Sequence, residues 1–304
     1  MIRQTTIKKK LMLRARIIRA IRQFFEDHDY LEVETPIRIP APAPEHHIDA
    51  EPSGNWFLHT SPELCMKRLL AAGYERLFQI CKCFRSAERG HKHLPEMTLL
   101  EWYTAEEDYH HMMDQCQALI RYVLHHFNPA GKLVYQGRDI DLTQPWLKLS
   151  VADAFDRFAG TSMAEALDSG RFDEIMGLEI ESRLGMDRPV FLYDYPSACG
   201  ALARLKEGHP EVAERFELYI GGLELCNGFS ELTDPVEQKA RFVDEMDRRR
   251  QDGKSVYPMP EPFLEALARM PVSTGNALGI DRLVMLLTDA AEIDEVVAFR
   301  PEEL

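Results

Sequence analysis

Apolar and polar positions alternate with clear periods along most of the chain. Between residues 11 and 25 the apolar side chains recur every three or four positions, which predicts an amphipathic helix that ends at the acidic residues of 27–29. Residues 30–36 then alternate apolar and polar positions and stop at a proline, a pattern typical of a short strand. The proline-rich segment 37–52 predicts a loop.

The rest of the chain continues with short strands and a few longer helices. Ser61, Pro62 and Glu63 favour the start of a helix, because a hydroxyl can cap it, proline fits its first turn and a carboxylate suits its positive end. The pattern predicts further helices at 109–126, 234–251 and 280–287, and strands at 57–60, 76–84, 97–103, 190–195, 215–219, 222–227 and 275–279.

Residues 130–188 are weakly patterned, and we expect them to form a small peripheral insertion of helices. Several predicted strands follow one another as hairpins, with helices between the groups. This order favours an α+β fold with a largely antiparallel sheet flanked by helices, in one domain over residues 1–304.

Composition narrows the class of protein. Lys and Arg total 36 against 50 Asp and Glu, so the formal charge is 36 − 50 = −14, which argues mildly against nucleic acid as the main partner. Six cysteines without a Cys-x-x-Cys pair favour free thiols and a cytoplasmic location. No apolar run is long enough to span a membrane. The common glycine-rich nucleotide loops are absent, so an ATP site must be of another kind.

Three segments carry candidate chemistry. In the hairpin 84–103, Arg85 stands at a strand end and His93 at the return, so a basic loop closes over the sheet. Such a loop suits polyphosphate, because guanidinium groups match phosphate oxygens in a bidentate way; a solvated charged loop is the alternative.

The other two segments lie further along the chain. Glu224 and Glu231 flank a glycine turn and either hold Mg²⁺ between triphosphate oxygens or are exposed strand-end acids. Gly275 and Gly279 permit close backbone approach, and Arg282 in the next helix is either a second phosphate clamp or a structural ion pair.

Taken together and in this order, the segments resemble the three motifs of class II aminoacyl-tRNA synthetases. Ser-Pro-Glu-Leu-x-Met-Lys-Arg-Leu at 61–69, Glu-Trp-Tyr at 101–103 and Glu-x-x-Asn-Gly-Phe-Ser-Glu-Leu from 224 resemble the lysyl branch. The chain begins about ten residues before the first motif, so we expect no anticodon-binding domain. That arrangement resembles the elongation factor P–lysine ligase family, which attaches lysine, preferably (R)-β-lysine, to a lysine side chain of elongation factor P.

The resemblance implies an ATP-dependent, AMP-forming ligase that activates its amino acid as an acyl-adenylate, with tRNA an unlikely partner. It assigns Arg85 to the α-phosphate, Arg282 to adenine and the γ-phosphate, and Glu224 with Glu231 to Mg²⁺. Residues that complete the ATP site are Glu88, His93, Leu94, Met97, Leu225 and Gly279. Residues assigned to the amino acid are Ser61, Pro62, Glu63, Tyr103 and Glu231. A homodimer is expected through residues 11–40.

Two departures from the family pattern fall in the hairpin. The usual Arg-Asn-Glu reads Arg85-Ser-Ala-Glu88, and the usual His-Asn-Pro-Glu-Phe reads His93-Leu-Pro-Glu-Met97, so adenine would stack on a thioether. Two other functions stay open: a minimal synthetase that acylates RNA or a small metabolite, and a regulatory paralogue that binds amino acid or nucleotide without chemistry. Both arginines and both acids are present, which argues against the second.

Overall fold

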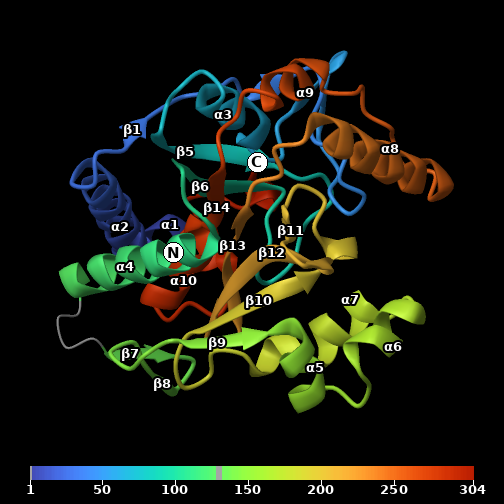
Figure 1. The fold of residues 1–304 in the computed structure, drawn as a ribbon. Helices are drawn as coiled ribbons and strands as arrows, with labels where there is room; N and C mark the ends of the chain where they lie inside the picture. Colours follow the sequence, from blue (N-terminus) through green and yellow to red (C-terminus); the bar gives the residue numbers. More distant parts are fainter. Residues whose placement is uncertain (1, 128–131) are drawn as a thin grey trace.

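The computed structural model describes residues 2–127 and 132–304 (Figure 1). Its helices are α1 (Arg3–Thr6), α2 (Lys8–Glu26), α3 (Glu63–Leu70), α4 (Tyr109–Phe127), α5 (Val151–Phe158), α6 (Met163–Asp168), α7 (Phe172–Ile175), α8 (Pro235–Gln251), α9 (Glu261–Leu267) and α10 (Ile280–Leu287). Its strands are β1 (Leu31–Glu32), β2 (Arg38–Ile39), β3 (Pro52–Ser53), β4 (Trp56–Leu58), β5 (Arg76–Phe84), β6 (Glu96–Ala105), β7 (Lys132–Tyr135), β8 (Arg138–Asp141), β9 (Leu147–Ser150), β10 (Val190–Pro196), β11 (Leu205–Lys206), β12 (His209–Ile220), β13 (Leu223–Ser230) and β14 (Ser273–Gly279).

One large sheet runs through the molecule in the order β1-β5-β6-β14-β13-β12-β10-β9, with β11 paired to β12. All pairs from β5 to β10 are antiparallel, and only the two outermost pairs, β1 with β5 and β9 with β10, are parallel. The expected α+β fold with a largely antiparallel sheet flanked by helices is therefore confirmed.

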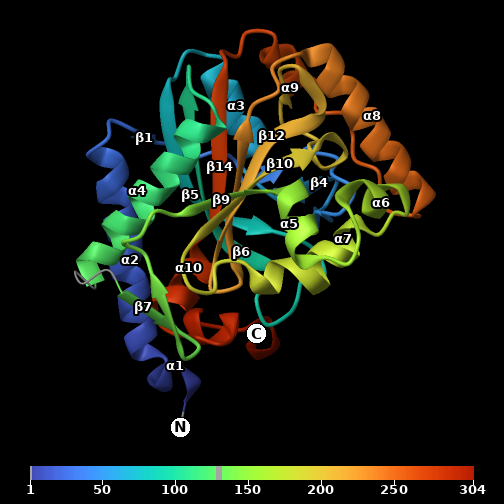
Figure 2. The ribbon, with the colours of Figure 1, turned by 60° about the horizontal axis from the view of Figure 1, so that its bottom comes forward.

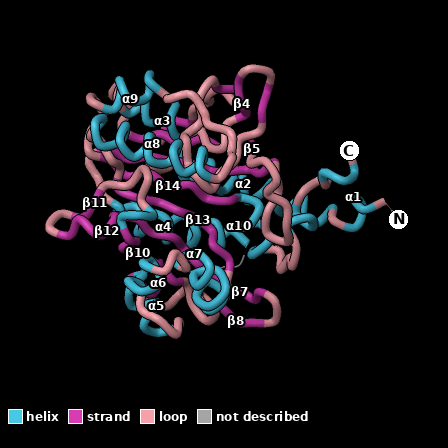
Figure 3. The backbone as a smooth tube through the Cα atoms, turned by 90° about the vertical axis from the view of Figure 1, so that its right-hand side faces the viewer, coloured by secondary structure: helices cyan, strands magenta, loops and turns pink. Residues whose placement is uncertain are grey.

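Helices cover the sheet in separate groups (Figures 1 and 2). The first group is α2, α4 and α10, whose apolar side chains form the largest buried cluster with β6, β13 and β14. A second cluster joins α3, α8 and α9, and a third joins α5–α7 to β10. Figure 3 places these last two groups at opposite ends of the sheet.

The alternation of side chains along β6 sets the two faces of this sheet. Leu100 and Trp102 point into the core beneath α2 and α4, whereas Leu99, Glu101 and Tyr103 line a cavity on the opposite face. Opposite them on β14 stand small residues, because Gly275 pairs with Tyr103, and Ala277 with Glu101. This pairing leaves room above the sheet for a ligand.

The segment 132–188 differs from the expected helical insertion. It does contain α5, α6 and α7, but it also contains the hairpin β7–β8 and the strand β9, which extends the central sheet. These strands are four residues long and lack a sustained alternation, so their pairing partners, not their own pattern, stabilise them. The helix α9 was also missed, because it begins among prolines.

Candidate active site

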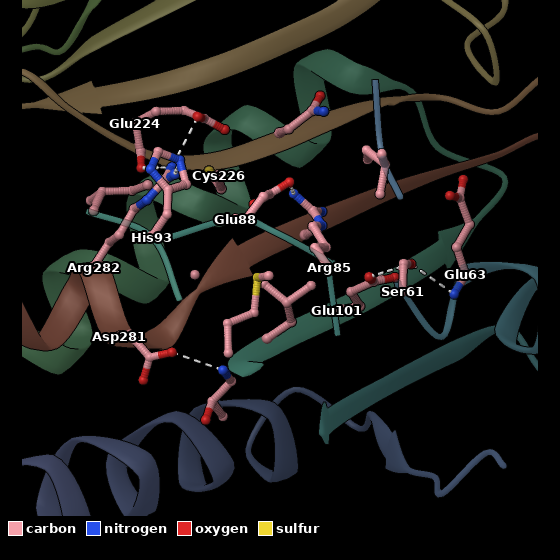
Figure 4. Close-up of a pocket in the computed structure, with 18 of the residues that line it drawn as sticks. Ser61, Glu63, Arg85, Glu88, His93, Glu101, Glu224, Cys226, Asp281 and Arg282 are labelled. Atoms are coloured by element: carbon pink, nitrogen blue, oxygen red, sulfur yellow. Dashed lines mark hydrogen bonds and ion pairs between the residues drawn. The ribbon is translucent and has the colours of Figure 1, made fainter. Parts of the chain in front are cut away.

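A cavity of about 510 Å³ opens over the middle of the sheet. Its walls come from the β5–β6 hairpin, from β13 and β14, from the start of α10 and from the loop before β3. Figure 4 shows the charged residues in two groups, with Arg282, His93 and Glu224 at one end, and Ser61, Glu63 and Glu101 at the other. Arg85 lies between them.

Arg282 organises the first group. It stands in the first turn of α10, and its Nη1 donates to both the backbone oxygen and the Oε2 of Glu224, each at 2.9 Å. Its Nη2 lies 2.6 Å from the Nε2 of His93. Burial and the Arg282 charge lower the pKa of His93, so the imidazole is neutral and accepts this hydrogen bond. Burial alone would raise the pKa of Glu224, but Arg282 reverses the shift and lowers it.

Arg85 follows the last residue of β5 and faces the middle of the cavity (Figure 4). Its Nη1 is 3.9 Å from the Oε1 of Glu88, a weak contact. Its Nε is buried and has no hydrogen-bond partner within the described part of the chain. A guanidinium with a free donor in a cavity is suited to an anionic ligand. The turn after it depends on Ala87 in a left-handed conformation, with φ of 63°.

The second group surrounds Glu101, a buried acid on β6. Its Oε1 accepts a hydrogen bond from Ser61 at 2.6 Å and its Oε2 accepts one from Tyr103 at 3.0 Å. Burial and the nearby Glu63 charge raise the pKa of Glu101 to about 8. A carboxyl group in this state gains most from a cationic ligand, because the cation restores its charged form.

A buried ammonium group, that of Lys67, pairs with two acids at this end of the cavity. Lys67 on α3 lies 2.5 Å from Glu63 and forms an ion pair with Glu231, and its side chain is only 1% exposed. One cation therefore serves two acids, and burial raises the pKa of Glu231 to about 8 despite Lys67. The acidic surplus at this end of the cavity favours a positively charged ligand.

Most of the residues predicted from sequence meet in this single cavity. Those that line it are Ser61, Glu63, Arg85, Glu88, His93, Leu94, Met97, Tyr103, Glu224, Leu225, Gly279 and Arg282. Pro62 and Glu231 do not line it. Pro62 occupies the N-cap position of α3, and Glu231 lies beside Gly275 and pairs with Lys67.

The predicted magnesium pair is not brought together. Glu224 and Glu231 stand at opposite ends of β13, and seven residues at the usual rise of a strand place them roughly 20 Å apart. They cannot share one ion. Acids that do interact with Glu224 are Glu181 and Glu217. The pKa of Glu217, on the neighbouring strand β12, is raised by burial and by the Glu224 charge.

Sequence reasoning gave no role to several charged residues of this region, among them Glu101, although Glu101 stands in the quoted Glu-Trp-Tyr motif. Glu217 precedes Glu224 by seven residues, and the β12–β13 hairpin brings them onto adjacent strands, a relation that needs the register of the hairpin to see. Lys67 follows Glu63 by four residues, a helical spacing that the sequence does show. Glu45 comes from the proline-rich loop, and burial and the Glu63 charge raise its pKa to about 7.

The sequence comparisons identify the family. Residues 1–303 match the class II tRNA synthetases of the D, K and N group. The chain belongs to this family. The predicted resemblance to class II synthetases is thereby confirmed.

Relatives within the class II family carry two different names. The chain is 38% identical to a lysine–tRNA ligase of Moorella thermoacetica and 35% identical to one of Thermoanaerobacter sp., over 98% and 96% of its own length. It spans about two thirds of the length of these ligases, 66% and 64%. It is also 38% identical to an elongation factor P–(R)-β-lysine ligase of Vibrio atlanticus, over 96% of this chain and 95% of that protein.

The helices of residues 2–127 and 132–304 include no membrane span. Each of them is too short or too polar to cross a bilayer.

Proposed function

We propose that this class II ligase activates lysine or (R)-β-lysine with ATP and transfers the aminoacyl group to a lysine side chain of elongation factor P. The observation that carries the proposal is one cavity with a cationic middle and end, formed by Arg85 and Arg282, and an acidic end, formed by Glu63 and Glu101. The negative phosphates of ATP match the two arginines, and an amino acid with a second ammonium group matches the two acids.

For the activation step, the amino acid carboxylate attacks the α-phosphate of ATP and pyrophosphate leaves. Such a reaction depends on positioning and on neutralising charge. Arg85, with its unpartnered Nε, is assigned to the α-phosphate, and Arg282 to the outer phosphates and adenine. Met97, Leu94 and the backbone around Leu225 are assigned to the adenine side of the same cavity.

The magnesium assignment is revised to Glu217 and Glu224. These carboxylates provide the oxygen ligands that Mg²⁺ prefers, and a divalent cation would offset the repulsion that raises the pKa of Glu217. Bound there, the ion would neutralise charge on the leaving pyrophosphate. Tyr195 and Tyr219 donate to the Oε2 of Glu217 at 2.6 and 2.7 Å and hold that carboxylate in place.

At the acidic end, Glu63, Glu101 and Tyr103 are assigned to the ammonium groups of the amino acid, with Ser61 orienting Glu101. Glu231 is assigned to this end as well, because its carboxylate pairs with Lys67 and lies beside Gly275 on the same side as Tyr103. A neutral amino acid of the same length leaves buried acids unpaired and should be rejected, at a cost of about 3–5 kcal/mol.

The choice of acceptor draws on the relatives. The similarity to the Vibrio atlanticus ligase extends over 95% of that protein, which supports a protein acceptor. The lysine–tRNA ligases are equally similar in identity, so acylation of RNA is the second candidate.

The test has two stages. ATP–pyrophosphate exchange is measured with lysine, (R)-β-lysine, ornithine and norleucine, and no exchange with any diamino acid contradicts the activation step. Labelled amino acid is then offered with elongation factor P or with tRNA in separate reactions. Mass spectrometry should show an aminoacylated lysine on elongation factor P, whereas labelling of tRNA alone would replace that acceptor.

We further propose a single catalytic domain, a homodimer formed through residues 11–40 and a cytoplasmic location. All six cysteines are free, as in a reducing compartment. Three large apolar side chains within residues 11–40 are exposed, as expected of a surface that a second copy covers: Met12, Leu31 and Ile37.

A further inference from the structure

A cluster of thiol and imidazole groups lies beside the cavity and has no part in the proposed reaction. Cys81 and Cys83 project from the same face of β5, and their Sγ atoms are 3.8 Å apart. His59, which follows β4, brings its Nε2 to 3.8 Å from the Sγ of Cys83. One ligand atom from each residue lies within 4.8 Å of the others. His59 and Cys83 are buried and Cys81 is half-buried.

These distances match those between ligands of one tetrahedral metal ion. With metal–sulfur bonds of about 2.3 Å and metal–nitrogen bonds of about 2.0 Å, two sulfurs are separated by roughly 3.8 Å and a sulfur and a nitrogen by roughly 3.5 Å. The sulfur pair already has this spacing, the 3.8 Å between His59 Nε2 and Cys83 Sγ exceeds it by about 0.3 Å, and the Cys81 and His59 ligand atoms lie within 4.8 Å of each other. We propose that His59, Cys81 and Cys83 bind one thiophilic divalent cation of the Zn²⁺ type.

A second feature marks the open fourth position. Gln79 precedes Cys81 by two residues on the same face of β5 and is only 2% exposed. Its Oε1 is buried and has no hydrogen-bond partner among residues 2–127 and 132–304. A water molecule that completes the tetrahedron would donate to this oxygen, and three protein ligands with one water is the pattern of open zinc sites.

Binding of the cation displaces protons from the imidazole and the thiols. In the metal-free protein the Nε2 of His59 lies 2.7 Å from the carbonyl oxygen of Lys82, so it carries a proton that must leave before that nitrogen binds a cation. Cys83 loses its thiol proton as well. Cys81 likewise binds as a thiolate. These protons pass to solvent.

The chain contains a matched comparison for this cluster. Cys116 and Cys226 are a second pair of close thiols, with Sγ atoms 3.9 Å apart. They are buried, and Asn276, not a histidine, approaches Cys116 at 3.3 Å. Within the part of the chain that the structure describes, only the His59 cluster combines two thiols with a third ligand.

The experiment titrates the whole, reduced, metal-free protein with Co²⁺ in the absence of oxygen. We expect one equivalent to produce a sulfur-to-cobalt charge-transfer band and the intense d–d bands of a tetrahedral ion, and Zn²⁺ to displace them. Cys81→Ser and Cys83→Ser should abolish the charge-transfer band, and His59→Gln should weaken binding at least tenfold. The control Cys116→Ser should leave the spectrum unchanged.

The proposal is overturned if no charge-transfer band forms, or if the band survives in both Cys81→Ser and Cys83→Ser. Circular dichroism of each metal-free variant checks that it is folded. Should the buried Cys83→Ser fail this check, the half-buried Cys81→Ser and His59→Gln decide the outcome. None of these results depends on the proposed ligase reaction.

Discussion

At the scale of single residues, burial and neighbouring charges determine which carboxyl groups of the cavity region are ionised. Arg282 holds Glu224 in its charged form, while Glu101 and Glu231 are held towards their neutral forms. Lys67 is the internal cation shared between Glu63 and Glu231. The acidic end thus has more carboxyl groups than cations, and its remaining capacity for positive charge is what a diamino acid would use.

Arg282→Ala should remove the clamp on the outer phosphates. Its guanidinium currently contacts both Glu224 and His93, so the substitution also frees the acid assigned to magnesium. We expect ATP–pyrophosphate exchange to fall by roughly 10²–10³-fold, the usual loss for one preorganised donor. The control is Arg269→Ala. This arginine is exposed, lies in the turn after α9 and does not line the cavity, so its loss should leave exchange unchanged. Equal losses in both variants would contradict the assignment.

Glu101 predicts how the affinity for lysine depends on pH. Because burial raises its pKa to about 8 in the free enzyme, the carboxyl is mostly protonated at pH 6–7 and must lose its proton when an ammonium binds. Affinity therefore rises with pH up to about 8, by at most tenfold per pH unit if one proton is displaced. The KM for lysine in the exchange assay should fall over this range, with a smaller change in kcat.

Glu101→Gln provides the check on that profile. The amide cannot titrate, so the KM should be high and nearly flat between pH 6 and 8. Glu265→Gln, at an exposed position on α9, should keep the wild-type slope. A Glu101→Gln profile with the same slope as the wild type would assign the dependence to another group, with Glu45 and its raised pKa next in order.

At the scale of elements, the site is built where β6, β14 and β13 lie side by side. The large residues of β6 stand opposite the small residues of β14, so the width of the cavity is set by strand register. Gly275 is the tightest point, because a Cβ there would lie 2.3 Å from the Cε1 of Tyr103 and 2.5 Å from the Oε1 of Glu231. Neither neighbour can move freely, since both are buried.

Gly275→Ala should therefore damage both stability and lysine binding. Overpacking of this kind costs about 1–3 kcal/mol, and a displaced Tyr103 loses its alignment with Glu101. We expect a lower melting temperature and a raised KM for lysine, with the KM for ATP less affected. Gly160→Ala, where the added methyl meets open space, should change neither quantity. A fully stable Gly275→Ala protein with normal KM would show that the strands can separate at no cost.

The sequence predicted these central elements well and the edges poorly. The strand 76–84 was placed to the residue, because its alternation is long and β6 pairs along all of it. The strand β9 was missed, because four residues show no period and their partners on β10 lie 43 positions further along the chain. The same limit explains the magnesium pair: Glu231 was chosen from its motif, whereas Glu217 is defined by the register of two strands.

At the scale of the whole molecule, contacts between distant segments fix the rim of the site. Arg249 on α8 is fully buried and donates to the carbonyl oxygens of Glu45 and Ile48 and to the carboxylate of Asp49. These contacts span about 200 positions and hold the loop that brings Glu45 into the cavity. The termini also meet, as Arg3 pairs with Glu303 (Figures 2 and 3).

The exposed apolar residues of the N-terminal segment lead to a prediction on assembly. Leu31 on β1 is 49% exposed, and Ile37, just before β2, is 43% exposed. A two-fold interface uses each residue twice, so a charge placed there acts twice against the dimer. Light scattering of the wild type should give twice the mass of the 35.0 kDa chain. The double variant Leu31→Asp and Ile37→Asp should give the mass of one chain.

The control for this prediction is an apolar residue that is exposed like Leu31 and Ile37 but lies elsewhere on the molecule. Val236, at the start of α8, is 78% exposed and lies outside residues 11–40, so Val236→Asp should leave the dimer intact. A wild-type protein that scatters as a single chain at all concentrations contradicts the dimer outright. A dimer that survives the double variant but dissociates with Val236→Asp would move the interface to α8. Because neither face contributes a residue to the cavity, ATP–pyrophosphate exchange by the monomeric variant then separates the role of assembly from that of the site itself.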